Sequence, residues 1–318
     1  MKIVLTDAQT VTNGDLDLSV FEKYGEVVRY SLTNRAESMK RLADADAVLL
    51  NKTVLDREVL SCAPRLRYIG IFATGYNMID LDCCRERGIT VSNAGSYSTD
   101  AVAQTVFAFL LHHYSKAAQY SAFVSEGGWM SSPSFSPFVF PTMELAGKTL
   151  GIIGYGAIGH KVAEIAHAFS MRVLVLPHKK PDTESDGLVT FTDFDTLLAS
   201  SDAVTCHCPL NDESRGMFNA EAFSKMKRGA YFINTSRGGV VVEEALRDAL
   251  ETEHLAGAGI DVLTTEPMAQ DCVLYRAKNL TVTPHVAWAP YETRVRLLSI
   301  VEENLKNFLE GHPTHVIV

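Results

Sequence analysis

The chain has 318 residues, of which 47% are hydrophobic and 21% charged, which suits a globular protein with material for two domains. Its net charge of −9 argues against a nucleic acid or an anionic membrane as a partner. The longest apolar stretch, 101–111, is interrupted by Gln104 and Thr105, so we expect no membrane-spanning helix. The apolar part of the N-terminus is too short for a signal peptide, and we expect a cytoplasmic protein.

The six cysteines form no metal or redox motif, because no two of them have the CxxC spacing. The Cys83–Cys84 pair and the residues Cys206 and Cys208 lie in apolar segments, which is typical of buried, reduced thiols. The sequence therefore predicts no metal site.

The first hundred residues alternate short apolar runs with helical patterns. This βα repeat predicts a parallel sheet covered by helices on both faces. The expected strands are 2–6, 26–30, 47–50, 67–71 and 89–91, and the expected helices are 16–24, 37–43, 56–61 and 80–87.

A longer helix is expected over 100–120, with its N-terminal signal at 98–100. The segment 125–145 follows, rich in Gly, Ser and Pro, and it also contains Trp129 and several phenylalanines. It is too apolar for a free linker, so we expect a packed connection, against its own chain or against a partner subunit.

A second βα series begins at Lys148, and the chain closes with a helix over 291–310 that ends before Gly311. The chain therefore forms two α/β domains, with the second inserted between the first and the closing helix. Such proteins bind ligands in the cleft between the domains. The expected strands of the second series are 149–153, 172–176, 203–206, 230–233, 257–262 and 280–282.

A glycine pattern connects the first strand of this series to a helix. Strand, glycine turn and helix together form the dinucleotide-binding fingerprint, in which the helix N-terminus faces the phosphates. The predicted inner face of the helix contains Val162, Ile165, Ala166 and Phe169. The fingerprint residues, which we expect to bind the cofactor, are Gly154, Tyr155, Gly156, Ala157, Ile158 and Gly159.

The residues at the end of the next strand indicate whether the cofactor is NAD(H) or NADP(H). NAD-binding domains have an acidic residue there for the ribose 2′-OH, whereas this chain has Pro177 followed by His178 and Lys179. These two side chains suit a 2′-phosphate, so NADP(H) is favoured over NAD(H). An exposed basic turn without cofactor contact is the alternative, and the nearby Asp182 and Glu184 would favour NAD(H).

Three later strands are followed by loops that carry Arg237, Glu266 and His285. An arginine can clamp the carboxylate of a 2-keto acid, and a histidine can protonate its carbonyl oxygen as hydride arrives. A neighbouring Glu266 would favour the imidazolium and fix its tautomer. The alternatives are a structural histidine, a salt bridge of Arg237 and a loop-capping role of Glu266.

With these residues in place, the chain resembles the D-isomer-specific 2-hydroxyacid dehydrogenases over essentially its full length. The matching segments are 73–80, 154–159, 201–210, 232–239 and 284–285. The resemblance implies a flavodoxin-like substrate domain, 1–99 with 286–318, and a Rossmann NAD(P)-binding domain, 100–285. It implies the catalytic set Arg237, Glu266 and His285, a substrate-carboxylate loop of Thr74, Gly75 and Tyr76, and cofactor contacts at Pro209, Thr235 and Asp261.

Within the family, the branch that the chain resembles is that of the glycerate dehydrogenases, also called hydroxypyruvate reductases. Asn51 and Trp288 carry this resemblance and are expected at the substrate site, where a bulky Trp288 would favour small substrates. A core position is the alternative for Trp288. His207 lies at a strand end and is counted with the cofactor residues, with a purely structural role as the alternative.

The expected function is the NAD(P)H-dependent reduction of hydroxypyruvate to D-glycerate and of glyoxylate to glycolate. The alternatives are another substrate, such as that of a D-lactate dehydrogenase or a bulkier 2-keto acid, and a nucleotide-sensing protein that resembles the corepressors of this fold. The resemblance also implies a homodimer formed through 100–120 and 125–145, and domain closure about hinges near 98–99 and 284–286.

Overall fold

The structure is a computed structural model that describes residues 1–177, 185 and 187–318. Its internal contacts divide the chain into two units. Unit 1 comprises Met1–Ser98 and Ala289–Val318, and unit 2 comprises Thr99–Trp288. Each unit contains one sheet whose strands all pair in parallel, which confirms the predicted fold class of two parallel α/β domains.

Unit 1 has a five-stranded sheet in the order β2-β1-β3-β4-β5. All five strands were predicted to within one residue at each end, because their apolar runs are short and bounded by polar residues. The strand order reverses between β1 and β3, which is the flavodoxin-like arrangement. The strands are β1 (Lys2–Leu5), β2 (Glu26–Arg29), β3 (Ala47–Leu50), β4 (Tyr68–Ile71) and β5 (Thr90–Ser92).

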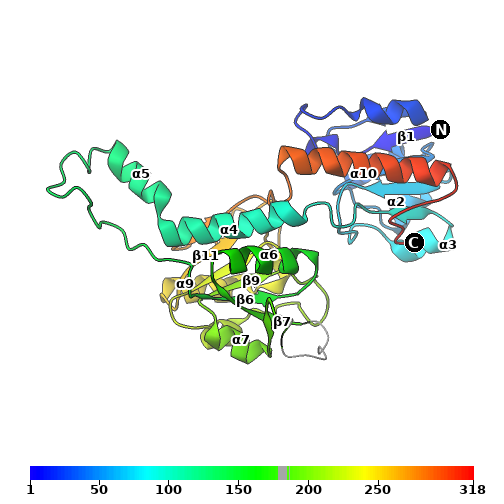
Figure 1. The fold of residues 1–318 in the computed structure, drawn as a ribbon. Coiled ribbons are helices and arrows are strands. Elements are labelled where there is room, and N and C mark those ends of the chain that lie inside the picture. Colours follow the sequence, from blue (N-terminus) through cyan, green and yellow to red (C-terminus); the bar gives the residue numbers. More distant parts are fainter. Residues whose placement is uncertain (178–184, 186) are drawn as a thin grey trace. The chain divides into compact units, whose positions relative to one another are not determined.

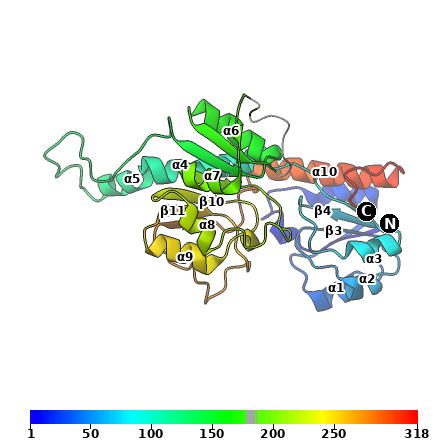
Figure 2. The ribbon, with the colours of Figure 1, turned by 90° about the horizontal axis from the view of Figure 1, so that it is seen from below.

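Helices cover both faces of this sheet, as Figure 2 shows. The face that carries Val48 and Ile69 packs against the α1–α3 side, and α10 crosses the other face, where Phe308 stacks on Tyr68 at 4.6 Å between ring centroids. The predicted α-helix 16–24 is instead a 3₁₀ helix, which Asp17 begins by accepting the N–H of Ser19. The elements are η1 (Ala8–Thr10), η2 (Leu18–Tyr24), α1 (Arg35–Arg41), α2 (Arg57–Ser61), α3 (Leu81–Glu86) and α10 (Tyr291–Leu309).

Unit 2 has a seven-stranded sheet in the order β12-β11-β10-β9-β6-β7-β8, which is the Rossmann order with one added strand. The strand order reverses between β6 and β9. The strand predicted over 257–262 is found two residues earlier, as β11, and β8 was not predicted. The strands are β6 (Thr149–Ile153), β7 (Arg172–Leu176), β8 (Thr190–Phe191), β9 (Ala203–Cys206), β10 (Ala230–Asn234), β11 (Leu255–Ile260) and β12 (Leu280–Val282).

Two apolar cores lie on the two faces of this sheet. One joins Leu150 and Ile152 of β6 to α4 and α6, and the other joins Phe232 of β10 to the helices α7, α8 and α9. The inner face of α6 is Gly159, Val162, Ala163 and Ala166, whereas Phe169 is exposed, contrary to the prediction. The helices are α4 (Thr99–Ser115), α6 (Ala157–Ala168), α7 (Phe194–Ser200), α8 (Ala220–Lys225), η3 (Gly238–Val240) and α9 (Glu243–Glu251).

The predicted helix 100–120 is broken into α4 and α5 (Ala117–Ser125). Lys116 adopts the left-handed conformation, with φ of 53°, and turns the chain between them. From α5 onward, residues 117–143 project from the rest of unit 2 (Figure 1), and we call this segment the arm. Its Met130, Phe135 and Phe138 are 89%, 90% and 92% exposed. These three side chains therefore do not pack against their own chain, which was the first of the two alternatives expected from the sequence.

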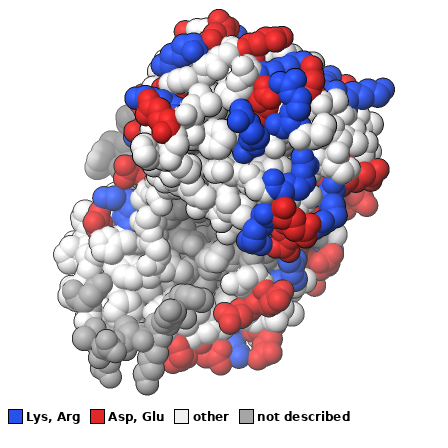
Figure 3. All heavy atoms as spheres, turned by 90° about the vertical axis from the view of Figure 1, so that its right-hand side faces the viewer, with Lys and Arg blue, Asp and Glu red and all other residues white. Residues whose placement is uncertain are grey.

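The surface of unit 1 carries charges of both signs. On the face shown in Figure 3, lysine and arginine side chains lie interspersed with aspartate and glutamate side chains. Pairs such as Arg57–Glu86, at 2.6 Å, and Arg35–Asp56, at 2.7 Å, belong to this unit. In the part of the chain that the structure describes, no helix is long and apolar enough to cross a membrane.

Candidate active site

The glycine turn between β6 and α6 is built as the fingerprint requires. Gly154 has φ of 95°, and a Cβ there would lie 2.8 Å from the backbone nitrogen of Cys208. A Cβ on Gly159 would lie 2.2 Å from the carbonyl oxygen of Gly154. Only glycine fits either position, because in both cases the obstructing atoms belong to the backbone.

Gly156 differs from the other two glycines, because nothing lies within 4 Å of the place where its Cβ would be. It is the N-cap of α6, and no side-chain cap of this helix is found among the described residues. Free N–H groups at a helix N-terminus, next to open space, fit the phosphates of a dinucleotide. This turn also lies where the strand order reverses, which is where open α/β sheets bind their ligands.

The other residues of the fingerprint support the turn. The ring of Tyr155 packs near Phe191 and His160, at 5.8 and 5.4 Å between ring centroids. Ala157 and Ile158 begin α6. Pro177 follows β7 directly, while His178 and Lys179, which carry the predicted preference for NADP(H), lie outside the described residues.

The loop after β9 adjoins the glycine turn. The backbone N–H of His207 donates to the carbonyl of Ile153 at 2.7 Å, and its Nε2 lies 3.1 Å from the Thr205 hydroxyl oxygen. Its Nδ1 is buried and has no hydrogen-bond partner among the described residues, and burial lowers the pKa of this imidazole to about 3. His207 is therefore neutral at pH 7, and Pro209, two residues further on, is exposed.

A second buried polar atom without a partner among the described residues is the hydroxyl oxygen of Thr235, directly after β10. The strands β9 and β10 pair side by side, with Cys206 opposite Asn234. Buried polar groups are almost always hydrogen-bonded, so an exception calls for a specific reason. A polar ligand bound along these strand ends would satisfy both His207 and Thr235, which fits a nicotinamide dinucleotide at this edge.

Arg237 lies in the loop after β10, and Asn234 shapes that loop. The Asn234 side-chain oxygen accepts the backbone N–H of Ser236 at 3.0 Å, and its amide nitrogen donates to the carbonyl of Arg237 at 3.0 Å. The half-buried guanidinium donates to the carbonyl of Ser236 at 2.7 Å. No aspartate or glutamate among the described residues forms an ion pair with it, so the salt-bridge alternative finds no partner there.

Glu266 and His285 meet as the sequence suggested. The Glu266 Oε2 lies 2.7 Å from the His285 Nδ1, and its Oε1 accepts the N–H of Leu263 at 2.9 Å. Both side chains are partly exposed. The carboxylate favours a proton on Nδ1, so Nε2 is the imidazole nitrogen that faces away from it. The backbone N–H of His285, which has φ of 55°, donates to the carbonyl of Asp261 at 2.8 Å.

Asp261 holds the loop that carries His285. Its buried carboxylate accepts the hydroxyl of Thr283 at 2.5 Å and the backbone N–H groups of Val286 and Ala287 at 2.9 Å each. Burial raises the pKa of Asp261, although these hydrogen bonds act in the opposite direction. The carboxylate is thus engaged within its own chain, and its contact with a nicotinamide carboxamide stays a prediction.

The three catalytic candidates follow three neighbouring strands. The strands β10, β11 and β12 pair in parallel, with Asn234 opposite Ile260 and Ile260 opposite Val282. Arg237, Glu266 and His285 therefore extend from the same edge of one sheet, the edge to which the glycine turn also belongs.

In unit 1, the predicted loop Thr74–Tyr76 follows β4. The side-chain amide of Asn93 donates to the carbonyl of Thr74 at 2.7 Å, and the Thr74 hydroxyl donates to the carbonyl of Gly95. Gly75 and Tyr76 leave part or much of their surface exposed, and Trp288, at the end of unit 2, is half-buried.

Asn51 is only 3% exposed, and its amide nitrogen donates to the backbone and hydroxyl oxygens of Thr10. Asp7, which the sequence analysis did not select, accepts the backbone N–H groups of Asn51, Lys52 and Thr53 at 2.6–2.9 Å. Asp7 and Asn234 share one sequence signal, a short polar side chain at or just past the end of a buried strand, which is typical of local side-chain to backbone hydrogen bonds.

Comparison with known proteins agrees with this geometry. Residues 107–287 match the model for the NAD binding domain of D-isomer specific 2-hydroxyacid dehydrogenases. The chain is 42% identical to a hydroxypyruvate reductase of Blautia hydrogenotrophica, over 100% of this chain and 99% of that one. It is 36% identical to a glycerate dehydrogenase of Methylorubrum extorquens, over 99% and 98% of the two chains.

Among solved structures, the TT0316 protein from Thermus thermophilus superposes with a TM-score of 0.89 at 33% identity, over 100% of both chains. Fold, site and relatives together define an oxidoreductase that uses a nicotinamide cofactor. The chain belongs to the family of D-isomer specific 2-hydroxyacid dehydrogenases.

Proposed function

We propose that the protein reduces hydroxypyruvate to D-glycerate with NAD(P)H, and that glyoxylate is a second substrate. The observation that carries this proposal is the pairing of Glu266 with His285 at 2.7 Å, on the sheet edge that also bears Arg237. The names of the relatives from Blautia hydrogenotrophica and Methylorubrum extorquens support this choice of substrate.

In this proposal, the guanidinium of Arg237 binds the carboxylate of the keto acid and polarises its carbonyl group. The cofactor, when bound, supplies the hydride. The Nε2 of His285 donates a proton to the carbonyl oxygen and takes it back in the reverse direction. Glu266 fixes the orientation and the tautomer of the imidazole through Nδ1.

The predicted substrate residues complete the proposal. The backbone amides of Thr74, Gly75 and Tyr76 bind the substrate carboxylate, and Trp288 limits the size of the substrate. For Asn51 we propose an indirect role, because its amide nitrogen donates to Thr10 and its backbone N–H donates to Asp7.

Initial rates test the proposal most directly. Hydroxypyruvate, glyoxylate, pyruvate and phenylpyruvate are each compared with NADH and with NADPH. We expect hydroxypyruvate to give the highest kcat/KM, and His285→Ala to lower it about 100- to 10,000-fold while cofactor affinity is retained. A highest rate with phenylpyruvate would contradict the role of Trp288. Tight cofactor binding without turnover of any keto acid would favour the nucleotide-sensing alternative.

We further propose a preference for NADPH, on the basis of Pro177 at the position where NAD-binding domains carry an acidic residue. The variant Pro177→Asp should repel a 2′-phosphate and shift the ratio of kcat/KM values toward NADH by about tenfold or more. The variant Lys179→Ala should weaken NADPH binding and leave NADH binding unchanged. Equal affinities of the wild type for both cofactors would contradict this preference.

We also propose that the protein is a homodimer in which the arm packs against a second copy. Exposed apolar side chains as large as Phe135 and Phe138 are costly to leave in water. The double variant Phe135→Ser/Phe138→Ser should shift the mass in light scattering from dimer toward monomer. A wild type that is monomeric at micromolar concentration would refute the proposal.

A further inference from the structure

Two loops of the active-site edge touch each other. Gly238, next to Arg237, lies against the peptide that joins Leu263 to Thr264. A Cβ on Gly238 would lie 1.9 Å from the carbonyl carbon of Leu263 and 2.3 Å from the nitrogen of Thr264. The two backbones are therefore in direct contact, and the position of one loop limits that of the other.

Glu243 joins the same two loops a second time. It is the first residue of α9, which continues from the loop of Arg237, and its Oε1 accepts the backbone N–H of Thr264 at 2.7 Å. Its Oε2 lies 3.8 Å from the Sγ of Cys272. An acidic side chain also suits the first turn of a helix, where the dipole is positive.

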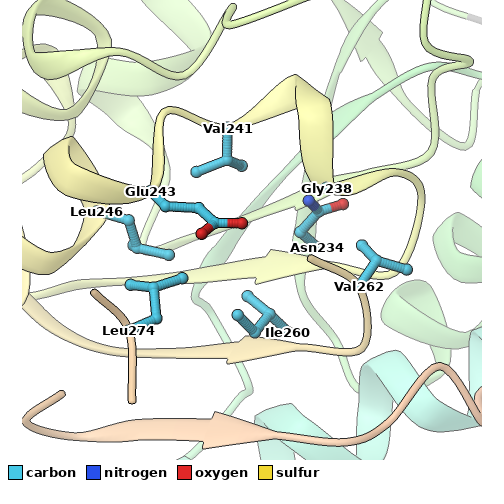
Figure 4. A pocket seen from close by; sticks show the side chains of 8 residues that line it. All are labelled: Asn234, Gly238, Val241, Glu243, Leu246, Ile260, Val262 and Leu274. Carbon is cyan, nitrogen blue, oxygen red and sulfur yellow. The ribbon is translucent and has the colours of Figure 1, made fainter. Parts of the chain in front are cut away.

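The carboxylate of Glu243 points into a small cavity between α9 and the sheet, as Figure 4 shows. Most of the residues that line this cavity are apolar, while the hydrogen bond between the Thr264 N–H and Glu243 is itself exposed. The side chain of Asn234, which binds the carbonyl of Arg237, lies across the same cavity. The cavity is lined by Asn234, Gly238, Val241, Glu243, Leu246, Ile260, Val262 and Leu274.

From Thr264 the connection continues to the catalytic pair. Its neighbour Leu263 donates its N–H to the Oε1 of Glu266, and the Oε2 of Glu266 binds the Nδ1 of His285. A displacement of the turn from Leu263 to Glu266 would therefore move the carboxylate that orients the imidazole. Glu243 lies at the start of this chain of contacts and is connected to the catalytic pair through Thr264 and Leu263.

We propose that Glu243 is a positioning residue, which holds the turn that carries Glu266 against the loop that carries Arg237. The inference rests on the proposed function, because it matters only if Arg237 and His285 act on one substrate. In such a reaction, a misplacement of about 1 Å lowers the rate about 100-fold without loss of the catalytic groups themselves.

Three variants separate this role from a general effect on stability. Glu243→Ala removes the acceptor of the Thr264 N–H, Glu243→Gln keeps an oxygen that can accept it, and Glu244→Ala removes the neighbouring exposed acid from the same helical turn. We expect Glu243→Ala to lower kcat about 10- to 100-fold, with KM and the dissociation constant of the cofactor changed less than about threefold. Glu243→Gln and Glu244→Ala should stay near the wild type.

Glu243→Asp provides a second test if Glu243→Ala does not fold. Its carboxylate is one methylene too short for the contact with Thr264, so kcat should again fall at unchanged cofactor affinity. The inference is overturned if the wild type is active but kcat falls no more in Glu243→Ala and Glu243→Asp than in Glu244→Ala. It is also overturned if kcat falls as much in Glu243→Gln as in Glu243→Ala. A wild type that reduces no 2-keto acid would overturn the proposed function, and this inference with it.

Discussion

In unit 1 the strand order reverses between β1 and β3, and in unit 2 it reverses between β6 and β9. Both reversals create a place where backbone N–H groups gather at the ends of parallel strands. In unit 1 the carboxylate of Asp7 occupies that place and accepts three N–H groups, those of residues 51–53. In unit 2 the corresponding turn ends in Gly156, and no side chain in the part of the chain that the structure describes caps the helix that follows.

The difference shows how one topology yields two kinds of site. The N–H groups of unit 1 bind an anion that belongs to the chain, so this reversal is a structural element. Among the described residues no side chain caps the N–H groups of unit 2, so we expect that reversal to be the place where a dinucleotide binds. Whether a side chain of the chain itself accepts the N–H groups at a reversal therefore decides between a structural role and ligand binding. Four experiments test this comparison.

The largest effect is expected from Asp7→Ala. It leaves the three N–H groups of residues 51–53 without their acceptor, and the loss of one partner from such a buried set costs about 3–5 kcal/mol. Urea unfolding should show this loss in the free energy of unfolding, while the cofactor, which binds to unit 2, keeps its affinity in the folded fraction. Asp44→Ala, which removes an exposed ion pair with Lys2, is the control and should change stability much less. Equal effects of the two variants would contradict the role of Asp7.

The next effect concerns the glycines of unit 2. Gly156→Ala should fold like the wild type, because its Cβ meets no neighbour, but should bind the cofactor about 10- to 100-fold more weakly, about 1.4–2.7 kcal/mol. Gly159→Ala should lower the melting temperature as well, since its Cβ would overlap the carbonyl of Gly154. Calorimetric titration and thermal unfolding distinguish the two variants. Unchanged cofactor affinity in Gly156→Ala would mean that the phosphates do not approach this turn.

A pH effect of intermediate size is expected from His207, the neutral imidazole beside the glycine turn. Burial lowers its pKa to about 3, whereas an unfolded histidine has a pKa of about 6.5. As the pH falls below about 6.5, the unfolded chain takes up a proton that the folded chain does not, so stability is lost. Between pH 7 and pH 5 this loss is about 2 kcal/mol. Urea unfolding at both pH values should show a smaller difference for His207→Gln than for the wild type, and His112→Gln, at an exposed position, should not reduce it.

The smallest effect compares two buried hydroxyl groups, one from each unit. The Oγ1 atoms of Thr53 and Thr235 both lack a hydrogen-bond partner among the described residues, so replacement by valine should change the stability of either unit little. Thr235→Val should nevertheless weaken cofactor binding about fivefold, about 1 kcal/mol, because the ligand loses one hydrogen bond. Thr53→Val should bind the cofactor like the wild type. A reversed result would place the cofactor in unit 1.

The sequence predicted every strand except β8, the glycine turn and the contact of Glu266 with His285, because each depends on a local pattern. Apolar runs identify buried strands, and polar residues directly after neighbouring parallel strands come to the same edge. The roles of Asp7 and Glu243 were not predicted. Their partners lie 44 to 46 and 21 residues away along the chain, and no local pattern indicates which loops touch.

The errors on the helices have a similar cause. Lys116 is a good helix former, and nothing in its neighbourhood predicts the left-handed turn that ends α4. The apolar composition of the arm predicted a packed segment, but composition does not tell contacts within a chain from contacts between chains. The helix α6 ends at Ala168, so Phe169 is its C-cap and stacks on Phe107, and it does not belong to the buried face of the helix.

Unit 1 is built from both ends of the chain, and this affects how the protein can form during synthesis. The helix α10 covers one face of a sheet whose strands end at Ser92, and the last residues pair with β5, where the N–H of Val91 donates to the carbonyl of Val318 at 2.8 Å. A growing chain therefore exposes that face of the sheet until residues 289–318 leave the ribosome. By then every residue of unit 2 has emerged, so the cofactor-binding unit can fold before unit 1 is completed.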